Sequence, residues 1–397
     1  MQRNLRLYLV YQVAHNGYFW LPVFFLYFSS ILPAGEVLLL EAIYFFAVVV
    51  LEVPSGYFSD RIGRRLTLLI SAGATVAAGA LFALTASFSA FVAGQALLAV
   101  AMSFNSGTDS ALLYDSLDAL DRGGEIGEME ARAHTWGFAA TATAALIGGA
   151  LAGWDLRLAY VLSGLSGLVA FGCAWQFVEP PRSGRRALPP AGQLRAVLAR
   201  LRNPLLAWLF AFSVVLVVVA HVPYEFFQPY LAFLFADRDT GVYAPTPLIA
   251  GLLVGAATAT AALASTRAMA LDRRLGTRAA LLGALALEGF IIAVMGCLVH
   301  PLVIALIALR SVPVAVSGPI VNARIHPRVQ TEIRATYLSV QSLAGRLAFS
   351  AALALASSAV GGAVMNAPIM SDVLLAFAGA AALCLAALAV TSRCAMR

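Results

Sequence analysis

The sequence predicts an all-α integral membrane protein of twelve transmembrane helices in two pseudo-symmetric six-helix bundles. Of its 397 residues, 61% are hydrophobic and only 12% are charged, whereas soluble domains carry about 45–50% apolar and about 25% charged residues. Mean hydropathy is +0.85, and arginines separate one long apolar run from the next. This composition excludes a soluble enzyme, a secreted disulfide scaffold and a disordered chain.

The individual spans are predicted from apolar runs interrupted by Arg, Pro or Gly. A helix needs about 20 mostly apolar residues to cross the hydrocarbon core. Short loops join most of the runs, so consecutive helices are expected to pack antiparallel. The twelve predicted spans are 6–31, 37–59, 66–87, 90–115, 131–153, 156–178, 204–235, 246–267, 278–299, 301–323, 333–360 and 370–392.

The longest linker, residues 179–203, follows the sixth span and divides the chain into bundles 1–178 and 204–397. It is expected to lie in the cytoplasm. Leu194, Val197, Leu198 and Leu201 recur in it at helical spacing beside arginines. That pattern predicts a short amphipathic helix on the membrane surface.

Orientation follows from the arginines, which are the only basic residues apart from histidine. With the N-terminus in the cytoplasm, 22 of the 26 fall on the cytoplasmic side, while Arg157 and Arg238 fall outside and Arg310 and Arg346 lie within spans. This is the positive-inside pattern of membrane proteins. It explains the net charge of +6 without a nucleic-acid partner, and it places both termini in the cytoplasm.

No cofactor, metal or catalytic motif is expected. The four cysteines show neither a CxxC pair nor metal-ligand spacing, and we interpret them as packing residues. There is no Walker loop, no HExxH helix and no GxSxG elbow with usable partners. The chain is therefore not predicted to be an enzyme, and any transport must draw on an ion gradient or on the gradient of the cargo.

The loop between spans two and three contains Gly56-Tyr57-Phe58-Ser59-Asp60-Arg61-Ile62-Gly63-Arg64-Arg65. The pattern Gly-x-x-x-Asp-Arg-x-Gly-Arg-Arg resembles the signature loop of the major facilitator superfamily of secondary transporters. The preceding Leu51-Glu52-Val53-Pro54-Ser55 is similar to the Glu-x-Pro-Ser/Thr-Gly run of one bacterial branch, and Ser106-Gly107-Thr108 and Ala111–Leu117 are again similar to that branch. The resemblance at the level of fold covers the whole chain.

The resemblance implies a conformational latch that holds the inner gate shut while the cavity faces outward. Glycine suits a tight turn or a close approach of helices. By resemblance, Asp60 accepts hydrogen bonds at the start of span eleven, and the arginines anchor the loop to headgroups and pair with an acid on span four. The latch residues are Gly56, Asp60, Arg61, Gly63, Arg64, Arg65 and Asp115, with Glu52 beside them in a structural role.

The second half contains a weaker copy of this loop. Leu271-Asp272-Arg273-Arg274-Leu275-Gly276-Thr277-Arg278 joins spans eight and nine, with its aspartate one position out of register. Duplicated halves that rock around a central site are typical of such transporters.

Two features differ from the family pattern. Span four has no basic residue, its nearest polar groups being Gln95 and Asn105, and span five lacks the proline of the antiporter branches. Both differences weaken an assignment as a drug–proton antiporter.

Ionisable residues inside a bilayer cost about 2.5–3.5 kcal/mol on insertion scales, so they are the candidates for function. The proton-coupling candidates are Glu225, His221 and Asp109. The candidates for lining the substrate cavity are His15, Asn16, Asn105, Tyr224, Gln228, Arg310 and Arg346. Glu41 lies near the outer interface, where we expect it to be solvated, and no role is assigned to Glu288.

We therefore expect a secondary active transporter that moves a small organic molecule by alternating access. The favoured version is a proton-coupled efflux antiporter for a drug or metabolite, in the cytoplasmic (inner) membrane of a bacterium, working as a monomer with the phospholipid bilayer as its surroundings. The alternatives are an organic-anion or metabolite importer or facilitator, and, from other classes, a membrane sensor or a polytopic lipid-modifying enzyme.

The orientation is testable by cysteine labelling. In a variant without the four native cysteines, Asp239→Cys should react with an impermeant thiol reagent added outside the cell, and Ser183→Cys should not. Labelling of both positions from the same side would contradict the division into two halves.

Overall fold

The computed structural model describes residues 1–181, 195, 197–235, 246–329 and 331–395, and all regular elements among them are helices. Hydrocarbon offers no hydrogen-bond partner to the backbone, so a helix, which satisfies its own amides, is the expected element. Within the described part of the chain, 10 helical segments are long and apolar enough to cross a membrane. The expected all-helical membrane fold is confirmed. In the predicted linker helix, residues 195 and 197–200 are described and are helical, and its place on the membrane surface stays a prediction.

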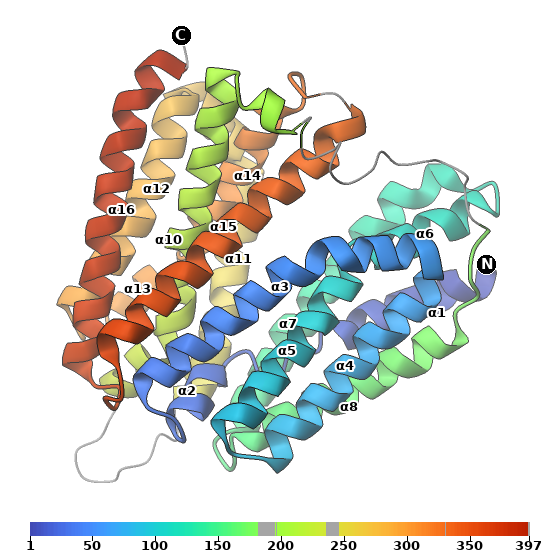
Figure 1. The fold of residues 1–397 in the computed structure, drawn as a ribbon, viewed down its shortest axis with the longest axis horizontal. Coiled ribbons are helices and arrows are strands. Elements are labelled where there is room, and N and C mark those ends of the chain that lie inside the picture. The colour runs from blue at the N-terminus through green and yellow to red at the C-terminus, as the bar shows by residue number, and fades with distance from the viewer. Residues whose placement is uncertain (182–194, 196, 236–245, 330, 396–397) are drawn as a thin grey trace. The chain divides into compact units, whose positions relative to one another are not determined.

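The helices of the first half occupy residues 2–176 (Figure 1). They are α1 (Gln2–His15), α2 (Phe24–Ser29), α3 (Ala34–Ile62), α4 (Arg64–Leu84), α5 (Phe88–Asn105), α6 (Thr108–Asp118), the 3-10 turn η1 (Gly123–Glu125), α7 (Ile126–Leu151) and α8 (Arg157–Gln176).

The helices of the second half run to residue 395. They are α10 (Pro204–Leu234), α11 (Thr246–Leu275), α12 (Thr277–Cys297), α13 (Val303–Ile307), α14 (Val312–Ile325), α15 (Thr331–Val360) and α16 (Ala367–Ala395).

Three predicted spans are interrupted helices. The first span, predicted as continuous over 6–31, is α1 and α2 separated by turns over 16–23. The fourth divides into α5 and α6 at Ser106 and Gly107, and the tenth into α13 and α14 around residues 308–311. The residues at these breaks are polar or turn-forming, among them Pro22, Gly107 and Arg310, but a hydropathy average over about 20 residues is dominated by the apolar residues on either side.

Contacts divide the chain into two compact units, which are described separately. The first comprises Met1–Arg185, Gly241–Leu252 and Leu353–Val364, and the second comprises Arg186–Thr240, Leu253–Ala352 and Met365–Arg397. Helices α11 and α15 thus contribute residues to both units.

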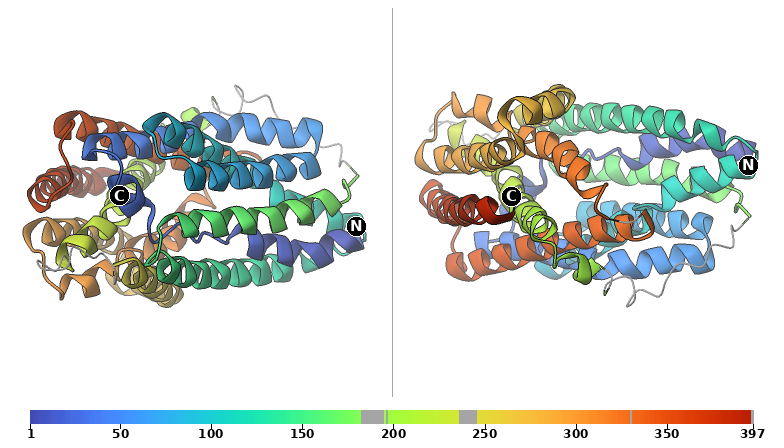
Figure 2. Two further views of the ribbon diagram at one scale, coloured as in Figure 1. Left: turned by 90° about the horizontal axis from the view of Figure 1, so that it is seen from below. Right: turned by 90° about the horizontal axis from the view of Figure 1, so that it is seen from above.

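In the first unit, α4 packs between α5 and α8, and α3 packs on α5 (Figure 1). Helix α1 lies alongside α7 and α8 (Figure 2). Aromatic rings fill the interior between these helices at one end: Tyr27, Phe28, Phe82, Phe91 and Tyr160 are all buried, with ring centroids 4.9–6.3 Å apart. Such tilted ring pairs contribute beyond the area that they bury.

In the second unit, α12 packs against α16, α14 and α10, and α10 also packs on α16. Side chains bond to helix carbonyls across these contacts. Trp208 Nε1 donates to the carbonyl of Leu388 at 3.0 Å, and the Tyr337 hydroxyl donates to that of Leu206 at 2.8 Å.

The aromatic cluster predicts a stability effect. Phe82 has no exposed surface, so Phe82→Ala should leave a cavity and lower the free energy of unfolding by about 3–5 kcal/mol. Thermal unfolding of the detergent-purified protein measures this loss. As a control, Phe46→Ala, at a side chain with 54% exposure, should change the unfolding temperature little. Equal effects of the two substitutions would contradict a buried aromatic core.

Candidate functional site

The turn between α3 and α4 depends on Gly63. Its φ of +130° is a conformation that L side chains rarely adopt, and a Cβ here would lie 2.8 Å from the carboxylate of Glu179. A glycine therefore meets two requirements at once, a backbone requirement and a steric one. Because Gly63 has no side chain, the carboxylate of Glu179 can approach the backbone directly.

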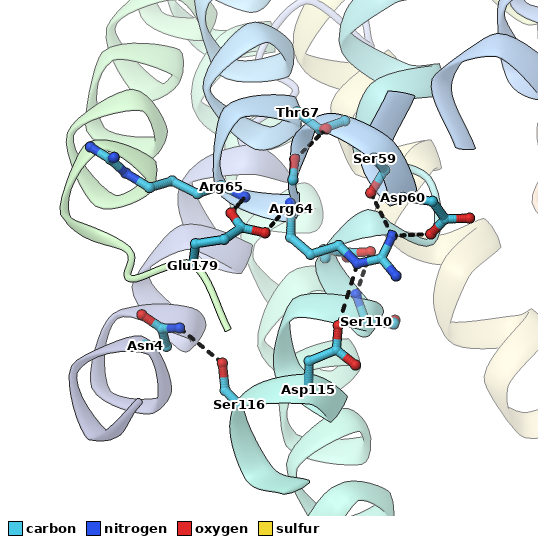
Figure 3. Close-up of polar contacts among 12 residues, drawn as sticks. Asn4, Ser59, Asp60, Arg64, Arg65, Thr67, Ser110, Asp115, Ser116 and Glu179 are labelled. Atoms are coloured by element: carbon cyan, nitrogen blue, oxygen red, sulfur yellow. Dashed lines mark hydrogen bonds and ion pairs between the residues drawn. The ribbon is translucent and has the colours of Figure 1, made fainter. Parts of the chain in front are cut away.

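Glu179, just beyond α8, caps the start of α4 (Figure 3). Its two carboxylate oxygens accept hydrogen bonds from the backbone N–H of Arg64 at 2.7 Å and of Arg65 at 2.9 Å. The first amides of a helix have no partner within the helix and carry the positive end of its dipole, so an anion stabilises them. Sequence analysis missed this residue. The available signal was a single acid directly after span six, on the side where arginines predominate.

Arg64 joins three helices (Figure 3). Its Nη1 donates to Asp60 Oδ1 at 2.6 Å and to Ser59 Oγ at 2.8 Å, both on α3, and its Nε lies 3.4 Å from Asp115 Oδ2 on α6. The side chains of Arg64 and Asp115 are 22% and 15% exposed, against 60% for Asp60. Because surface pairs contribute little, the pair with Asp115 is the one expected to matter for stability.

The other predicted latch residues lie outside the group of side chains that Arg64 contacts. Arg65 Nη2 donates to the carbonyl of Trp175 at 2.8 Å, and the Arg61 guanidinium lies over the ring of Tyr57 at 5.2 Å. Glu52 Oε1 accepts from the hydroxyl of Ser106 at 3.1 Å, which links α3 to the break between α5 and α6. Gly56 has no close neighbour in the described part of the chain.

The loop between α11 and α12 has the same geometry with the charges exchanged. Gly276, at φ +80°, separates the two helices. Asp272 is buried, and its Oδ2 accepts from Arg324 Nη2 of α14 at 3.0 Å, while the Thr277 hydroxyl bonds to its Oδ1 at 2.6 Å. In the first unit the loop supplies the arginine and α6, in the second span after the loop, supplies the acid. In the second unit the loop supplies the acid and α14 the arginine.

A polar network surrounds the break after α1 in the first unit. The Tyr11 hydroxyl donates to Asn105 Oδ1 at 2.7 Å, and Gln12 Nε2 donates to Asp109 Oδ2 at 2.6 Å and to the Tyr8 hydroxyl at 3.0 Å. His15, the last residue of α1, stacks on Tyr11 with ring centroids 5.8 Å apart.

Four predicted candidates, His15, Asn16, Asn105 and Asp109, thus lie in one network. Asn16 joins it by donating to the carbonyl of Gln12 at 2.8 Å. Sequence analysis missed Tyr8, Tyr11 and Gln12, although their spacing places them on the face of α1 that includes His15.

Neighbouring hydroxyls satisfy the backbone at the interruptions. Ser166 and Thr141 donate to the carbonyls of Ala14 and Asn16 at 2.7 and 3.1 Å. In the second unit, the Thr260 hydroxyl of α11 donates to the carbonyl of Ala308 at 2.7 Å. A break at membrane depth is tolerated when such groups replace the lost helical bonds.

The expected solvation of Glu41 is wrong. This side chain is only 5% exposed, and its Oε1 accepts from Gln95 Nε2 of α5 at 2.9 Å. Helical pitch turns the residue inward, toward α5, and the amide replaces the water that we expected.

In the second unit, the candidates His221, Tyr224, Glu225 and Gln228 lie along α10. Glu225 and Gln228 are buried, with 1% and no exposure. His221 Nδ1 is 2.6 Å from the carbonyl of Val217, and its ring is 5.1 Å from that of Phe349 on α15. Arg346, on α15, is half-buried and interacts electrostatically with His221.

Arg310 lies in the break between α13 and α14. It is 5% exposed, and its guanidinium carbon lies 4.6 Å from the ring centroid of Phe227 on α10. Arg310 Nη1 is buried and makes no hydrogen bond within the described structure. The nearby Glu288 on α12 has no exposed surface. Sequence analysis assigned it no role, because its predicted span is a peripheral one in the resembling fold.

No metal site emerges. Among the residues that the structure describes, no group of three or more His, Cys, Asp and Glu side chains is arranged to hold a metal ion.

Comparison with known proteins gives a consistent result. Residues 7–350 match the family model described as Major Facilitator Superfamily. A mutant of the nucleoside transporter NupG superposes with a TM-score of 0.81 at 14% identity, covering 98% of this chain and 99% of that one. A bacterial homologue of the human lysosomal transporter Spinster gives 0.70 at 17%, covering 99% and 96%. An auto-inhibited peptide transporter of the POT family gives 0.71 at 14%, covering 98% and 97%. No curated protein sequence matches the chain.

The capping contact of Glu179 predicts a measurable loss. Glu179→Ala leaves two amides at the start of α4 without their anion, which should cost about 1 kcal/mol, as for loss of a helix cap. The unfolding temperature of the purified protein should fall. The control is Glu128→Ala, an exposed acid in the first turn of α7. Glu128 acts on its helix only through the dipole, so its removal should lower the unfolding temperature less than Glu179→Ala does. An unchanged unfolding temperature for Glu179→Ala would contradict the cap.

Proposed function

The chain belongs to the major facilitator superfamily, and from this premise we propose that it is a proton-coupled secondary transporter of a small organic molecule, working by alternating access. It is a transporter and not an enzyme, which removes the lipid-modifying enzyme from the alternatives. One observation carries the proposal of coupling: each unit holds buried ionisable side chains among membrane-spanning helices, His15 and Arg310 beside breaks and Glu225 within the continuous helix α10. Such residues mark proton and substrate pathways in membrane proteins.

Glu225 and His221 are the proposed proton carriers of the second unit, and Asp109 is that of the first. Glu225 and His221 are one helical turn apart on α10, so they share a face. Asp109 bonds to Gln12 at 2.6 Å, and the tyrosines around it offer a hydroxyl path.

The latch residues are proposed to stabilise one conformation of the cycle. Arg64 connects α3, α4 and α6 within the first unit, so a movement of the loop must break these bonds. The contact of Asp60 with span eleven stays a prediction. A membrane sensor would need no such breakable contact, which favours the transporter.

The cargo is proposed to be an organic molecule with an anionic group. The positive charge of Arg310 is the observation that favours this organic-anion alternative. A cationic cargo would be repelled by Arg310, whose charge has no hydrogen-bonded counter-ion at Nη1, and Arg346 adds a second positive charge. Structural relatives carry nucleosides and peptides by name, but at 14% identity they share the fold alone. Efflux by antiport stays a prediction.

The bacterial cytoplasmic membrane, with both termini on its inner side, is the proposed location, and the proposed working form is a monomer. The positive-inside distribution of arginine supports the orientation.

Transport itself is tested in proteoliposomes that contain the purified full-length chain. A panel of chemically diverse compounds, including organic carboxylates, phosphates and amines, is assayed for accumulation driven by a pH gradient of either sign. Uptake of a compound toward the alkaline side indicates co-transport with protons, and movement toward the acidic side indicates antiport. If no gradient of either sign drives any compound, proton coupling is wrong.

Glu225→Gln separates coupling from structure. If Glu225 carries the proton, exchange of cargo at equal concentrations should survive, and accumulation driven by pH should be lost. If Glu225 only balances Arg310, the substitution should cost about 3–5 kcal/mol of stability, and Glu225→Gln combined with Arg310→Gln should restore much of it. Glu128→Gln is the matched control at an exposed acid. Unchanged stability together with full pH-driven transport would exclude both roles for Glu225.

A further inference from the structure

Glu288 is a buried acid without a hydrogen-bond partner. It lies near the middle of α12 with no exposed surface, and neither carboxyl oxygen makes a hydrogen bond within the described structure. Burial of a carboxylate without partners costs far more than burial of the neutral acid. Its burial without a hydrogen bond therefore favours the neutral, protonated form of Glu288.

Arg310 is the charged group that acts on Glu288. The two side chains interact electrostatically, but no hydrogen bond or ion pair joins them in the described part of the chain. A guanidinium keeps its charge in any protein environment, and the ring of Phe227, 4.6 Å away, stabilises only part of it. The neutral Glu288 thus lies beside the Arg310 cation, whose Nη1 can donate a hydrogen bond to another group.

The remaining ionisable side chains on the helices packed against α12 lie elsewhere or belong to the same cluster. Tyr224 of α10 also interacts with Arg310, and Arg324 of α14 is paired with Asp272. The complete set on these helices and on α12 itself, besides Glu288 and Arg310, is His221, Tyr224, Glu225, Tyr230, Arg278, Cys297, Arg324, Asp372, Cys384, Arg393 and Cys394.

We propose that Glu288 is a proton-binding site of the transport cycle and that its carboxylate and an anionic group of the cargo alternate as the partner of Arg310. With Glu288 protonated, Arg310 is free to bind a carboxylate or phosphate of the cargo. When the cargo leaves, the proton passes from Glu288 to water, and the carboxylate formed pairs with the guanidinium.

The balance of charge at Arg310 determines whether the proton and the cargo move in the same direction. The loaded site contains one cation, one cargo anion and a neutral acid, and the empty site contains one cation and one carboxylate. The charges of these groups sum to zero in both states. The described arrangement, a neutral acid beside a cation, has a net positive charge and is the one that attracts an anion. The anion and the proton therefore move together, which is co-transport. The transport direction rests on the proposed function, whereas the proton site does not.

The proton site is tested without cargo. Infrared difference spectra of the purified full-length protein between acidic and alkaline pH report the C=O stretching band of each protonated carboxyl that loses its proton. Glu288→Gln should remove one component of this band, and Glu288→Asp should shift it in frequency. Arg310→Gln should abolish the response of that component to pH, because its carboxylate would have no cation to pair with. Glu128→Gln, at an exposed acid, should leave the component unchanged.

A Glu288→Gln spectrum identical to that of the wild type would overturn the proposal. If the glutamine variant does not fold, the Glu288→Asp spectrum decides, and the absence of a shifted band in it would overturn the proposal. In proteoliposomes, with a compound found to be driven by pH, Glu288→Gln should retain exchange and reduce pH-driven accumulation to the level seen without a gradient. Retention of that accumulation would overturn the role in coupling. If no compound responds to pH while the band belongs to Glu288, the proposed function fails and the proton site stands.

Discussion

The hydrocarbon interior of a bilayer imposes the constraint on which the rest of this structure depends: each backbone polar group must find its partner within the protein. The described chain meets it with helices throughout. Where helices are interrupted, hydroxyls of neighbouring helices complete the bonding, as Ser166 does for Ala14 and Thr260 does for Ala308. The interruptions are thus supported features of the fold, and ionisable side chains gather at them.

The two related loops show that the need to pair a charge beside the membrane fixes where an ion pair lies but not which partner carries which charge. In the first unit, Arg64 of the loop pairs with Asp115 of α6. In the second, Asp272 of the loop pairs with Arg324 of α14. An ion pair between a loop and the second span after it satisfies the same need with either polarity. An alignment of the halves by residue type alone therefore finds the glycines and misses the equivalent pairing.

Two buried acids illustrate how neighbours decide chemistry. Glu41 accepts a hydrogen bond from Gln95, whereas the Glu288 carboxyl has no such bond and lies beside a charged Arg310. An acid held by a neutral amide has no reason to change its partner. An acid beside an unpaired cation can change its protonation and its contacts together, which is what coupling of a proton to a cargo requires. Glu288 and Arg310 in the second unit can therefore act as a protonation switch, whereas Glu41, held by its hydrogen bond to Gln95, cannot.

The sequence by itself determined the all-helical membrane fold and the family, because long apolar runs and a ten-residue loop motif are local properties of the chain. It also indicated His15, Asn105, Asp109 and Arg310, since a polar residue within an apolar run is visible without a structure. The tertiary structure alone decided the partners. Glu179 reaches α4 from a distance of 115 residues in sequence, Gln12 joins Asp109 from another helix, and Glu288 turns inward toward Arg310. Pairing across helices depends on the rotation and depth of each helix, and no local pattern encodes those.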